Sequence, residues 1–256
     1  MSAAVAALYF YPVKGLSPQP LERIRLEPGR GVPHDRRFAI ARSSARIDPA
    51  NPEWQPKTSF LMLMRDEKLA QLTSRFDAET GELVVERNGK PVVHAKITEA
   101  MGRTVIGQFF AAFMGDAMRG APKVVEARHE PFTDQHRPLV SIINLASVRD
   151  LERVAGRAVD PLRFRANVYV DGLAPWEELH WQGAEIALGR ARLSVVKPID
   201  RCAATEVNPQ TAERDLNVPR TLERGFGHVR MGIYGEVTDG GDVTKGDALR
   251  PPETVT

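Results

Sequence analysis

Short runs of alternating apolar and polar residues, each closed by a turn signal, are the feature of this sequence that most limits its fold. Two Val-rich runs are joined by Asn88-Gly89, a dipeptide that strongly favours a β-hairpin turn. Strand-like runs separated by turn signals such as EPGRG and ETGE occur at 6–13, 21–27, 36–42, 68–76, 82–88 and 90–97. The first half of the chain is therefore expected to be mostly β-structure.

The second half continues this pattern around a few helices. Further strands are expected at 163–170, 184–189, 191–199 and 231–241. The clearest helix is 144–156, where Asn144 can cap the first turn and Gly156 can end the last, and shorter helical patterns lie at 104–115 and 219–226. The sequence thus favours a β-rich α+β protein with two barrel-like lobes that divide near residues 115–138.

Composition narrows the partners. The chain has 256 residues, 42% of them hydrophobic, which is enough for a core of ordinary size. Its 35 Lys and Arg residues nearly balance 33 Asp and Glu, so a formal net charge of +2 gives no general attraction to nucleic acid or an anionic membrane. The apolar N-terminal run lacks the leading positive charges of a secretory signal. We expect no nucleic-acid or membrane partner and a cytoplasmic location.

The single cysteine, Cys202, follows a strand that Pro198 is expected to end or bend. One thiol excludes an internal disulfide, a Cys-rich zinc site and a Cys-ligated iron–sulfur cluster. A free Cys is often a buried small hydrophobe. Here Arg201 can instead favour the thiolate, with Thr205 close by, and make the sulfur a nucleophile or a metal ligand. One protein ligand cannot hold a bare ion, so a metal would arrive in a cofactor.

Four further residues each allow a structural and a functional interpretation. Lys14 follows a proline at a strand exit, and is either a solvated lysine or a cation at a site. Arg36 can form a surface ion pair with Asp35 or offer a fork to a phosphate. Asn144 and Ser147 can cap the helix at 144–156 or help its N-terminus bind an anion.

Arg165 and Asn167 belong to the expected strand at 163–170. Side chains two residues apart on a strand point to the same face, so this Arg and this Asn should lie side by side among apolar neighbours. Taken together, these residues describe a site with one thiolate and several groups suited to phosphate. Such a set fits a phosphorylated cofactor whose metal bonds the sulfur.

The sequence resembles the MOSC superfamily, which includes the C-terminal domain of molybdenum cofactor sulfurases, together with its companion N-terminal β-barrel region. The matching segments, in order, are YPVKG at 11–15, Asp35-Arg36, SIINLASVRDL at 141–151, FRANVYVDG at 164–172, RCAATEVNPQTAERD at 201–215, and GIYGEV with GDVTKGD within 232–247. The resemblance covers nearly the whole chain. It implies an N-terminal β-barrel lobe at 1–115 and a β-barrel-like MOSC domain at 116–256, with a few short helices.

The resemblance also implies a molybdenum cofactor of the molybdopterin type. In amidoxime-reducing members of this family, the cysteine that matches Cys202 ligates molybdenum. The positions that match the motifs around the pterin and its phosphate are Lys14, Arg36, Asn144, Ser147, Arg165, Asn167, Arg201 and Thr205. Gly15, Asn144 and Leu145 depart from the residues common in the family, and the short stretch after Asp215 leaves the substrate open.

Three functions follow as hypotheses. The resemblance favours an oxidoreductase that reduces N-hydroxylated or N-oxide small molecules at a Cys-ligated molybdenum, with electrons from a separate protein. The alternative is a non-catalytic carrier or sulfur-transfer module for the cofactor, which would need an accessible, low-pKa thiol at Cys202. A hydrolase with Cys202 as nucleophile is the third, although none of the six histidines is marked by spacing as its base.

Overall fold

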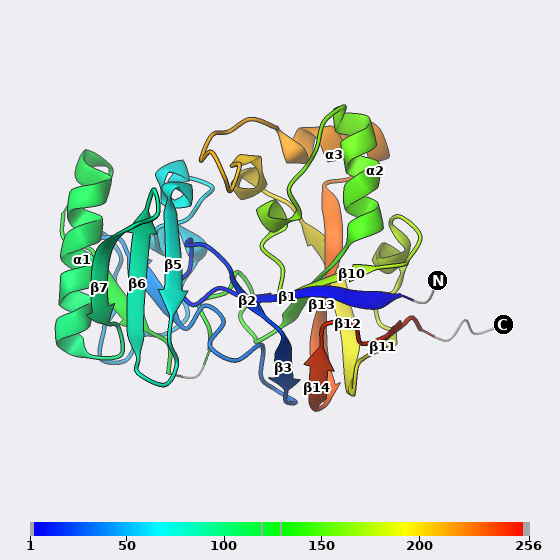
Figure 1. The fold of residues 1–256 in the computed structure, drawn as a ribbon, viewed down its shortest axis with the longest axis horizontal. Coiled ribbons are helices and arrows are strands. Elements are labelled where there is room, and N and C mark those ends of the chain that lie inside the picture. The colour runs from blue at the N-terminus through cyan, green and yellow to red at the C-terminus, as the bar shows by residue number, and fades with distance from the viewer. Residues whose placement is uncertain (1–2, 119, 129, 253–256) are drawn as a thin grey trace.

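The largest element of the structure, a computed structural model that describes residues 3–118, 120–128 and 130–252, is a curled eight-stranded sheet (Figure 1). Its strands in spatial order are β15 (Leu249–Arg250), β11 (Glu185–Leu188), β12 (Ala191–Asp200), β13 (Arg230–Asp239), β9 (Val140–Asn144), β10 (Val168–Asp171), β1 (Ala4–Phe10) and β2 (Gln19–Leu21). Only β9 and β10 pair in parallel. Hydrogen bonds from Val5 N to Asp247 O (2.8 Å) and from Leu249 N to Ala3 O (2.9 Å) draw the sheet toward closure. The expected β-rich, barrel-like fold is confirmed.

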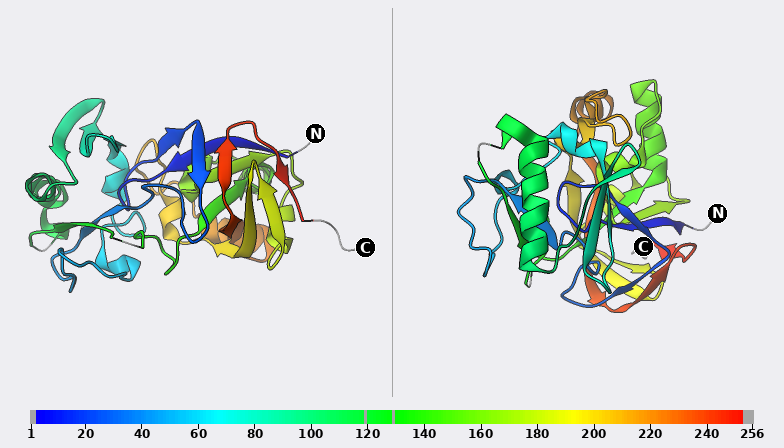
Figure 2. Two further views of the ribbon diagram at one scale, coloured as in Figure 1. Left: turned by 90° about the horizontal axis from the view of Figure 1, so that it is seen from below. Right: turned by 60° about the vertical axis from the view of Figure 1, so that its left-hand side comes forward.

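A second group of strands lies at the other end of the molecule, as Figure 2 shows from two further sides. Its elements are the antiparallel meander β5 (Leu72–Phe76), β6 (Glu82–Arg87) and β7 (Lys90–Lys96), the helix α1 (Ala100–Met114), and the pair β4 (Phe38–Ala41) and β8 (Lys123–Glu126). Asn88 and Gly89 both have positive φ angles, 52° and 70°. That is the geometry that a two-residue hairpin turn requires, and it explains why Asn-Gly stands there.

Strands from the first half of the chain pair within the large sheet, and a strand from after residue 116 pairs within the second group. β1 and β2 come early in the chain but belong to the large sheet, and β3 (Arg23–Leu26) pairs with β14 (Gly241–Thr244) near the C-terminus. β8 comes after residue 116 yet pairs with β4. One continuous hydrophobic cluster extends through both groups, from Val5 and Phe38 to Phe110 and Leu193. The two groups are therefore built on shared strands and a shared core.

Two helices cover one side of the large sheet. α2 (Leu145–Ala155) has the expected caps: the Asn144 side chain accepts a hydrogen bond from Ala146 N at 2.9 Å, and Gly156 ends the helix with φ 67°. α3 (Val218–Phe226) packs against α2, and Leu151 and Leu222 are fully buried between them. Within the described ranges, no helix is long and apolar enough to cross a membrane.

Six short 3₁₀ helices complete the described part of the chain. They are η1 (Lys57–Ser59), η2 (Glu67–Gln71), η3 (Gly115–Ala117), η4 (Pro161–Phe164), η5 (Glu177–His180) and η6 (Ala203–Glu206). Two of them, η2 and η4, replace parts of expected strands. The run at 68–76 begins as η2 before it becomes β5, because Asp66 and Glu67 open a turn.

The strand expected at 163–170 is wrong in its first half. Asp160 accepts a hydrogen bond from Leu162 N and Pro161 occupies the first helical position, so η4 forms and β10 starts only at Val168. Arg165 follows η4 in the left-handed conformation, with φ 53°. Arg165 and Asn167 are consequently loop residues and not alternate positions on one strand face.

Pro198 bends its strand without ending it. β12 continues to Asp200, and its register with β13 shifts between Pro198 and Asp200. The bulge accommodates the missing N–H of the proline. Cys202 therefore lies two residues beyond the strand, immediately before η6.

Gly232→Ala should destabilise the large sheet. Gly232 has φ 73° within β13, and an added Cβ would overlap with the Ile142 carbonyl and the Ile143 side chain on β9. The left-handed strain and the overpacking together should cost about 2–5 kcal/mol of unfolding free energy, measured by urea unfolding. Gly227→Ala is the matched control, since φ is 74° there and an added Cβ meets no described atom within 4 Å. Equal losses in the two variants would contradict this account.

Candidate functional site

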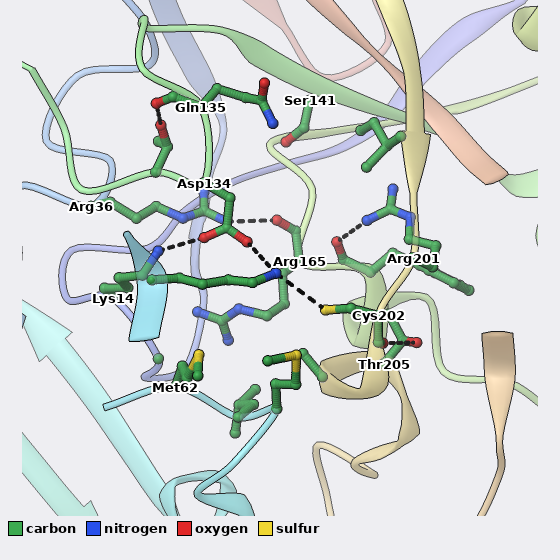
Figure 3. A pocket seen from close by; sticks show the side chains of 18 of the residues that line it. Lys14, Arg36, Met62, Asp134, Gln135, Ser141, Arg165, Arg201, Cys202 and Thr205 are labelled. Atoms are coloured by element: carbon green, nitrogen blue, oxygen red, sulfur yellow. Dashed lines mark hydrogen bonds and ion pairs between the residues drawn. The ribbon is translucent and has the colours of Figure 1, made fainter. Parts of the chain in front are cut away.

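A cavity of about 160 Å³ opens where the two groups of strands meet, and Cys202 lies on its wall (Figure 3). Seven of the nine residues singled out from the sequence line it: Lys14, Arg36, Arg165, Asn167, Arg201, Cys202 and Thr205. They come from loops that follow β1, η4 and β12, from the turn before β4 and, for Thr205, from η6. The tertiary structure thus brings together residues that lie up to about 190 positions apart in the sequence.

The cavity is strongly basic although the chain is nearly neutral. Six cationic side chains line it, namely Lys14, Arg36, Lys57, Arg163, Arg165 and Arg201. Three acidic side chains accompany them, namely Asp35, Asp134 and Asp200. Because like charges held close together repel, such a concentration is costly unless an anionic ligand offsets it.

Lys14 and Lys57 share one carboxylate. Lys14 Nζ donates to Asp134 Oδ1 at 2.6 Å and to the Phe132 carbonyl at 2.9 Å. Lys57 Nζ lies 3.5 Å from Asp134 Oδ2 and 3.8 Å from the sulfur of Cys202. In Figure 3 the sulfur of Cys202 faces Asp134 and Lys14 across the cavity. Lys14 is thus a buried cation at the site and not a solvated lysine.

Burial and charge act in opposite directions on these groups. Burial lowers the pKa of Lys14, and Asp134 offsets part of that effect. Burial would raise the pKa of Asp134, but Lys14 and then Lys57 lower it to about 2. Burial would likewise lower the pKa of Lys57, but Asp134 and Cys202 together raise it. At neutral pH the carboxylate is therefore ionised between two ammonium groups.

Arg36 lies near Asp134 in Figure 3 and is held by Asp35. Its Nη1 donates to both carboxylate oxygens of Asp35, at 2.7 and 2.6 Å, and its Nη2 donates to the carbonyl of Arg165 at 2.8 Å. Asp35 Oδ1 also accepts from the backbone N–H of Tyr11 at 2.8 Å. The guanidinium groups of Arg36 and Arg165 lie 4.1 and 4.4 Å from the centroid of the Tyr11 ring.

Arg165 has no such partner. Among the described residues, no carboxylate or carbonyl accepts a hydrogen bond from its guanidinium, whose contact is with the Tyr11 ring. Burial, with a smaller contribution from Arg36, lowers the pKa of Arg165 to about 10, so it remains charged at neutral pH. A charge removed from water without a counter-ion is unfavourable. The cavity therefore contains a ready binding group for an anion.

Asn167, Arg201 and Thr205 position the walls. Arg201 donates to the Met231 carbonyl at 2.9 Å and to the Phe164 carbonyl at 3.0 Å, which ties β13 to η4. Asn167 Oδ1 accepts from Ser141 Oγ at 2.8 Å and Asn167 Nδ2 donates to Tyr9 O at 3.3 Å.

The backbone at Cys202 is fixed by hydrogen bonds from Thr205, three residues later in the chain. The backbone N–H and the hydroxyl of Thr205 both donate to the Cys202 carbonyl, at 3.0 and 2.9 Å. This pair of hydrogen bonds closes the first turn of η6 and orients the residue that bears the thiol. Cys202 itself is only partly buried, so its sulfur is not the inert core group that many free cysteines are.

Asn144 and Ser147 do not line the cavity. Both are fully buried, and the Glu178 carboxylate lies against them, accepting from Asn144 Nδ2 at 2.9 Å and from Ser147 Oγ at 3.0 Å. Burial raises the pKa of Glu178, and the two hydrogen bonds act against that rise. A side-chain carboxylate thus takes the place at the N-terminus of α2 where the sequence suggested a phosphate.

Sequence reasoning missed Lys57, Asp134 and Tyr11 as parts of the site. Lys57 lies on η1 and Asp134 on the loop before β9, and neither stands in a periodic segment or a recognisable motif. Tyr11 lies in the YPVKG motif, but only the structure shows two guanidinium groups stacked on its ring.

The donor set fits a cofactor that brings its own metal ligands. Within the described residues, no group of three His, Cys, Asp or Glu side chains could hold a bare ion. A single partly exposed thiol shares its cavity with an unpaired guanidinium and several other cations. The thiol suits one coordination position of a metal, and the cations suit the anionic part of a bound cofactor.

Family models match most of the chain. Residues 130–250 match the MOSC domain and residues 2–120 match the MOSC N-terminal beta barrel domain. Among curated relatives, the molybdenum cofactor sulfurase of Drosophila willistoni is 36% identical over 96 residues, and that of Bos taurus is 37% identical over 73 residues. These alignments cover 36% and 28% of this chain, but only 12% and 8% of the relatives' own length.

Solved structures also show similarity. The YuaD protein of Bacillus subtilis aligns over 97% of this chain and 94% of its own, with 14% identity and a TM-score of 0.45. YiiM of Geobacillus stearothermophilus aligns over 44% of this chain and 54% of its own, with 20% identity and a TM-score of 0.36.

Asp134→Asn should lower the free energy of unfolding at neutral pH. The pKa of Asp134 falls from its ordinary value of 3.8 to about 2 in the folded protein, so its stabilisation is complete above about pH 4 and is lost as the pH falls through 2. The difference between the protein and the variant should therefore shrink from pH 4 to pH 2 in urea-unfolding series. Asp116→Asn, at an exposed position, is the control. A difference that stays constant over this range would refute the assignment.

Proposed function

Since the chain belongs to the MOSC superfamily, we propose that its basic cavity binds a molybdenum cofactor of the molybdopterin type, with Cys202 as the protein ligand of the metal. One observation carries this proposal above the others: the only thiol of the chain shares a cavity with Arg165, a partly buried cation that has no counter-ion of its own among the described residues. A metal-bearing anion would satisfy both groups at once.

The cations would hold the anionic part of the cofactor. Arg165 offers a free guanidinium fork, and Lys14 and Arg36 stand beside it with geometry already fixed by Asp134 and Asp35. A fixed arrangement lowers the entropy that binding must lose. Asn167, Arg201 and Thr205 would act through the backbone segments that they tie together.

We further propose that the protein is a reductase of N-hydroxylated or N-oxide small molecules. When bound, the cofactor supplies a two-electron redox centre. Cleavage of the N–O bond of a hydroxylamine consumes two electrons and two protons, and yields the amine and water. The electrons would come from a separate donor protein. Lys57 holds a proton on Nζ 3.8 Å from the sulfur of Cys202, and it would lie beside the reacting group.

A second candidate is a carrier that holds sulfur or the cofactor for delivery to another enzyme. The observation that favours it is the partial exposure of Cys202 beside the ammonium of Lys57, because a thiol near a cation suits a persulfide. The curated relatives bear the name molybdenum cofactor sulfurase, and only a small part of their length is matched. Persulfide formation on Cys202 with a sulfur donor, without turnover of any N-hydroxylated substrate, would favour the carrier.

Cys202→Ala should remove the metal and the activity. Protein purified from a host that makes the cofactor should contain near-stoichiometric molybdenum and pterin, and should reduce hydroxylamines with an artificial donor. The variant should retain at least about tenfold less molybdenum, since even loss of a supporting partner costs that much at metal sites. Met64→Ala, which removes a thioether sulfur from the wall of the same cavity, is the control. Equal molybdenum in both variants would eliminate Cys202 as the ligand.

Arg165→Gln should weaken retention of the cofactor with little effect on folding, because among the described residues the guanidinium has no hydrogen-bond or ion-pair partner to lose and contacts only the Tyr11 ring. Loss of a charged hydrogen bond should reduce the pterin retained after dialysis by about tenfold or more. Arg165→Lys, which keeps the charge without the fork, should retain an intermediate amount. Arg192→Gln on β12 is the control for a surface arginine. Full pterin retention in Arg165→Gln would remove Arg165 from the anion site.

A further inference from the structure

A second, smaller cavity adjoins the basic one. It has a volume of about 70 Å³, and the two cavities share Gly15, Leu63, Arg163, Arg165 and Ala204 as lining residues. We call it the apolar annex. It lies between the two groups of strands, with η2 and β5 on one side and η4 and η6 on the other.

The walls of the annex present mostly hydrocarbon. Leu16, Leu69 and Leu72 contribute from one side, and Leu162 and Val207 contribute from the other. These side chains are among the most hydrophobic available, and water inside such a space finds few partners. The annex therefore favours an apolar group over a polar one.

The polar residues of the annex are largely engaged elsewhere. Ser17 Oγ accepts from the backbone N–H of Ser74 at 2.7 Å. Arg163 pairs with Asp215 at 2.6 Å and donates to the Glu206 carbonyl at 3.0 Å. Arg165 stands at the boundary with the basic cavity, and the exposed Thr73 stands at the rim. A ligand group inside the annex would thus meet more carbon than polar surface, with Arg165 at the side that opens to the basic cavity.

The annex lies next to the turn that follows the thiol-bearing residue. Ala204, which lines both cavities, belongs to η6, the turn that begins right after Cys202 and is fastened to it by Thr205. A small molecule whose N–O group lies near Cys202 could therefore extend its remaining atoms past Ala204 into the annex.

The size of the annex limits what it can hold. A cavity of 150 Å³ lined by Leu, Ile and Phe holds benzene, so about half that volume suits about three or four carbon atoms. We propose that the annex receives the apolar substituent of the substrate, and that the preferred substrates are N-hydroxylated compounds with a compact alkyl group of this size. This inference rests on the proposed function and specifies its substrate class.

Equilibrium binding tests the annex without turnover. The dissociation constants of a series of N-alkylhydroxylamines, from methyl to hexyl, would be measured by calorimetry on cofactor-loaded protein with no electron donor present. Each methylene up to about four carbons should tighten binding about three- to fourfold, and longer chains should gain nothing more. The methyl NMR signals of Leu69 and Leu72 should shift when the butyl compound binds.

Two variants that fill the annex provide the decisive comparison. Ala70→Leu and Leu162→Phe, at partly buried positions on opposite walls, should abolish the dependence of affinity on chain length while the methyl compound binds as before. Ala112→Leu, on the exposed face of α1, is the matched control and should bind like the unaltered protein. An affinity that does not change with chain length, or an equal dependence in the filled variants, would overturn the inference.

The same series separates this inference from the proposed function. Tightening with chain length but no reduction of any member by an artificial donor would retain the annex as the alkyl-binding site and reject the reductase. Reduction of the compounds without any dependence of affinity on chain length would retain the reductase and reject the annex. A chain-length dependence that occurs only in cofactor-free protein would assign the annex to the cofactor and overturn the inference.

Discussion

The arrangement of the site depends on holding six positive charges around one small cavity. Three carboxylates make this possible. Asp134 lies between Lys14 and Lys57, Asp35 binds Arg36 through both oxygens and also accepts from the backbone of Tyr11, and Asp215 pairs with Arg163. Without these carboxylates, Coulomb repulsion between the cationic side chains would favour loss of their protons or a more open cavity. Among the described residues, no carboxylate pairs with Arg165, so this cation remains available to a ligand.

This concentration of charge requires a rigid frame, and the shared strands supply it. β1, which leads to Lys14, lies in the large sheet beside β10, which follows Arg165 and Asn167. Arg214 adds a clamp on the other side, donating to the Leu63 and Met64 carbonyls at 3.1 and 2.9 Å and to the Ala203 carbonyl at 2.9 Å. The two halves of the cavity are thus tied together on both sides of Cys202.

The reductase and the carrier use the same physical features in different ways. In both, a partly exposed thiol beside an ammonium group provides a soft ligand, and the basic cavity provides an anion site. They differ in whether the cavity retains its cofactor while a substrate enters. The apolar annex that we propose for the alkyl group bears on that difference, because a space for hydrocarbon next to the basic cavity is useful to an enzyme that binds substrates.

The sequence by itself determined the β-rich α+β class, the Asn88-Gly89 hairpin, the capped helix at 144–156 and the choice of Cys202, Lys14, Arg36 and Arg165 as candidate site residues. These features depend on local periodicity, on turn chemistry or on contiguous motifs, all of which are visible along the chain. Tertiary structure alone decided that Glu178 occupies the N-terminus of α2, that Lys57 reaches both Asp134 and Cys202, and that Arg165 is left without a hydrogen-bond partner among the described residues. Those outcomes depend on side chains more than thirty, and in one case nearly 150, residues apart, and no local pattern records which of them meet once the sheet has curled.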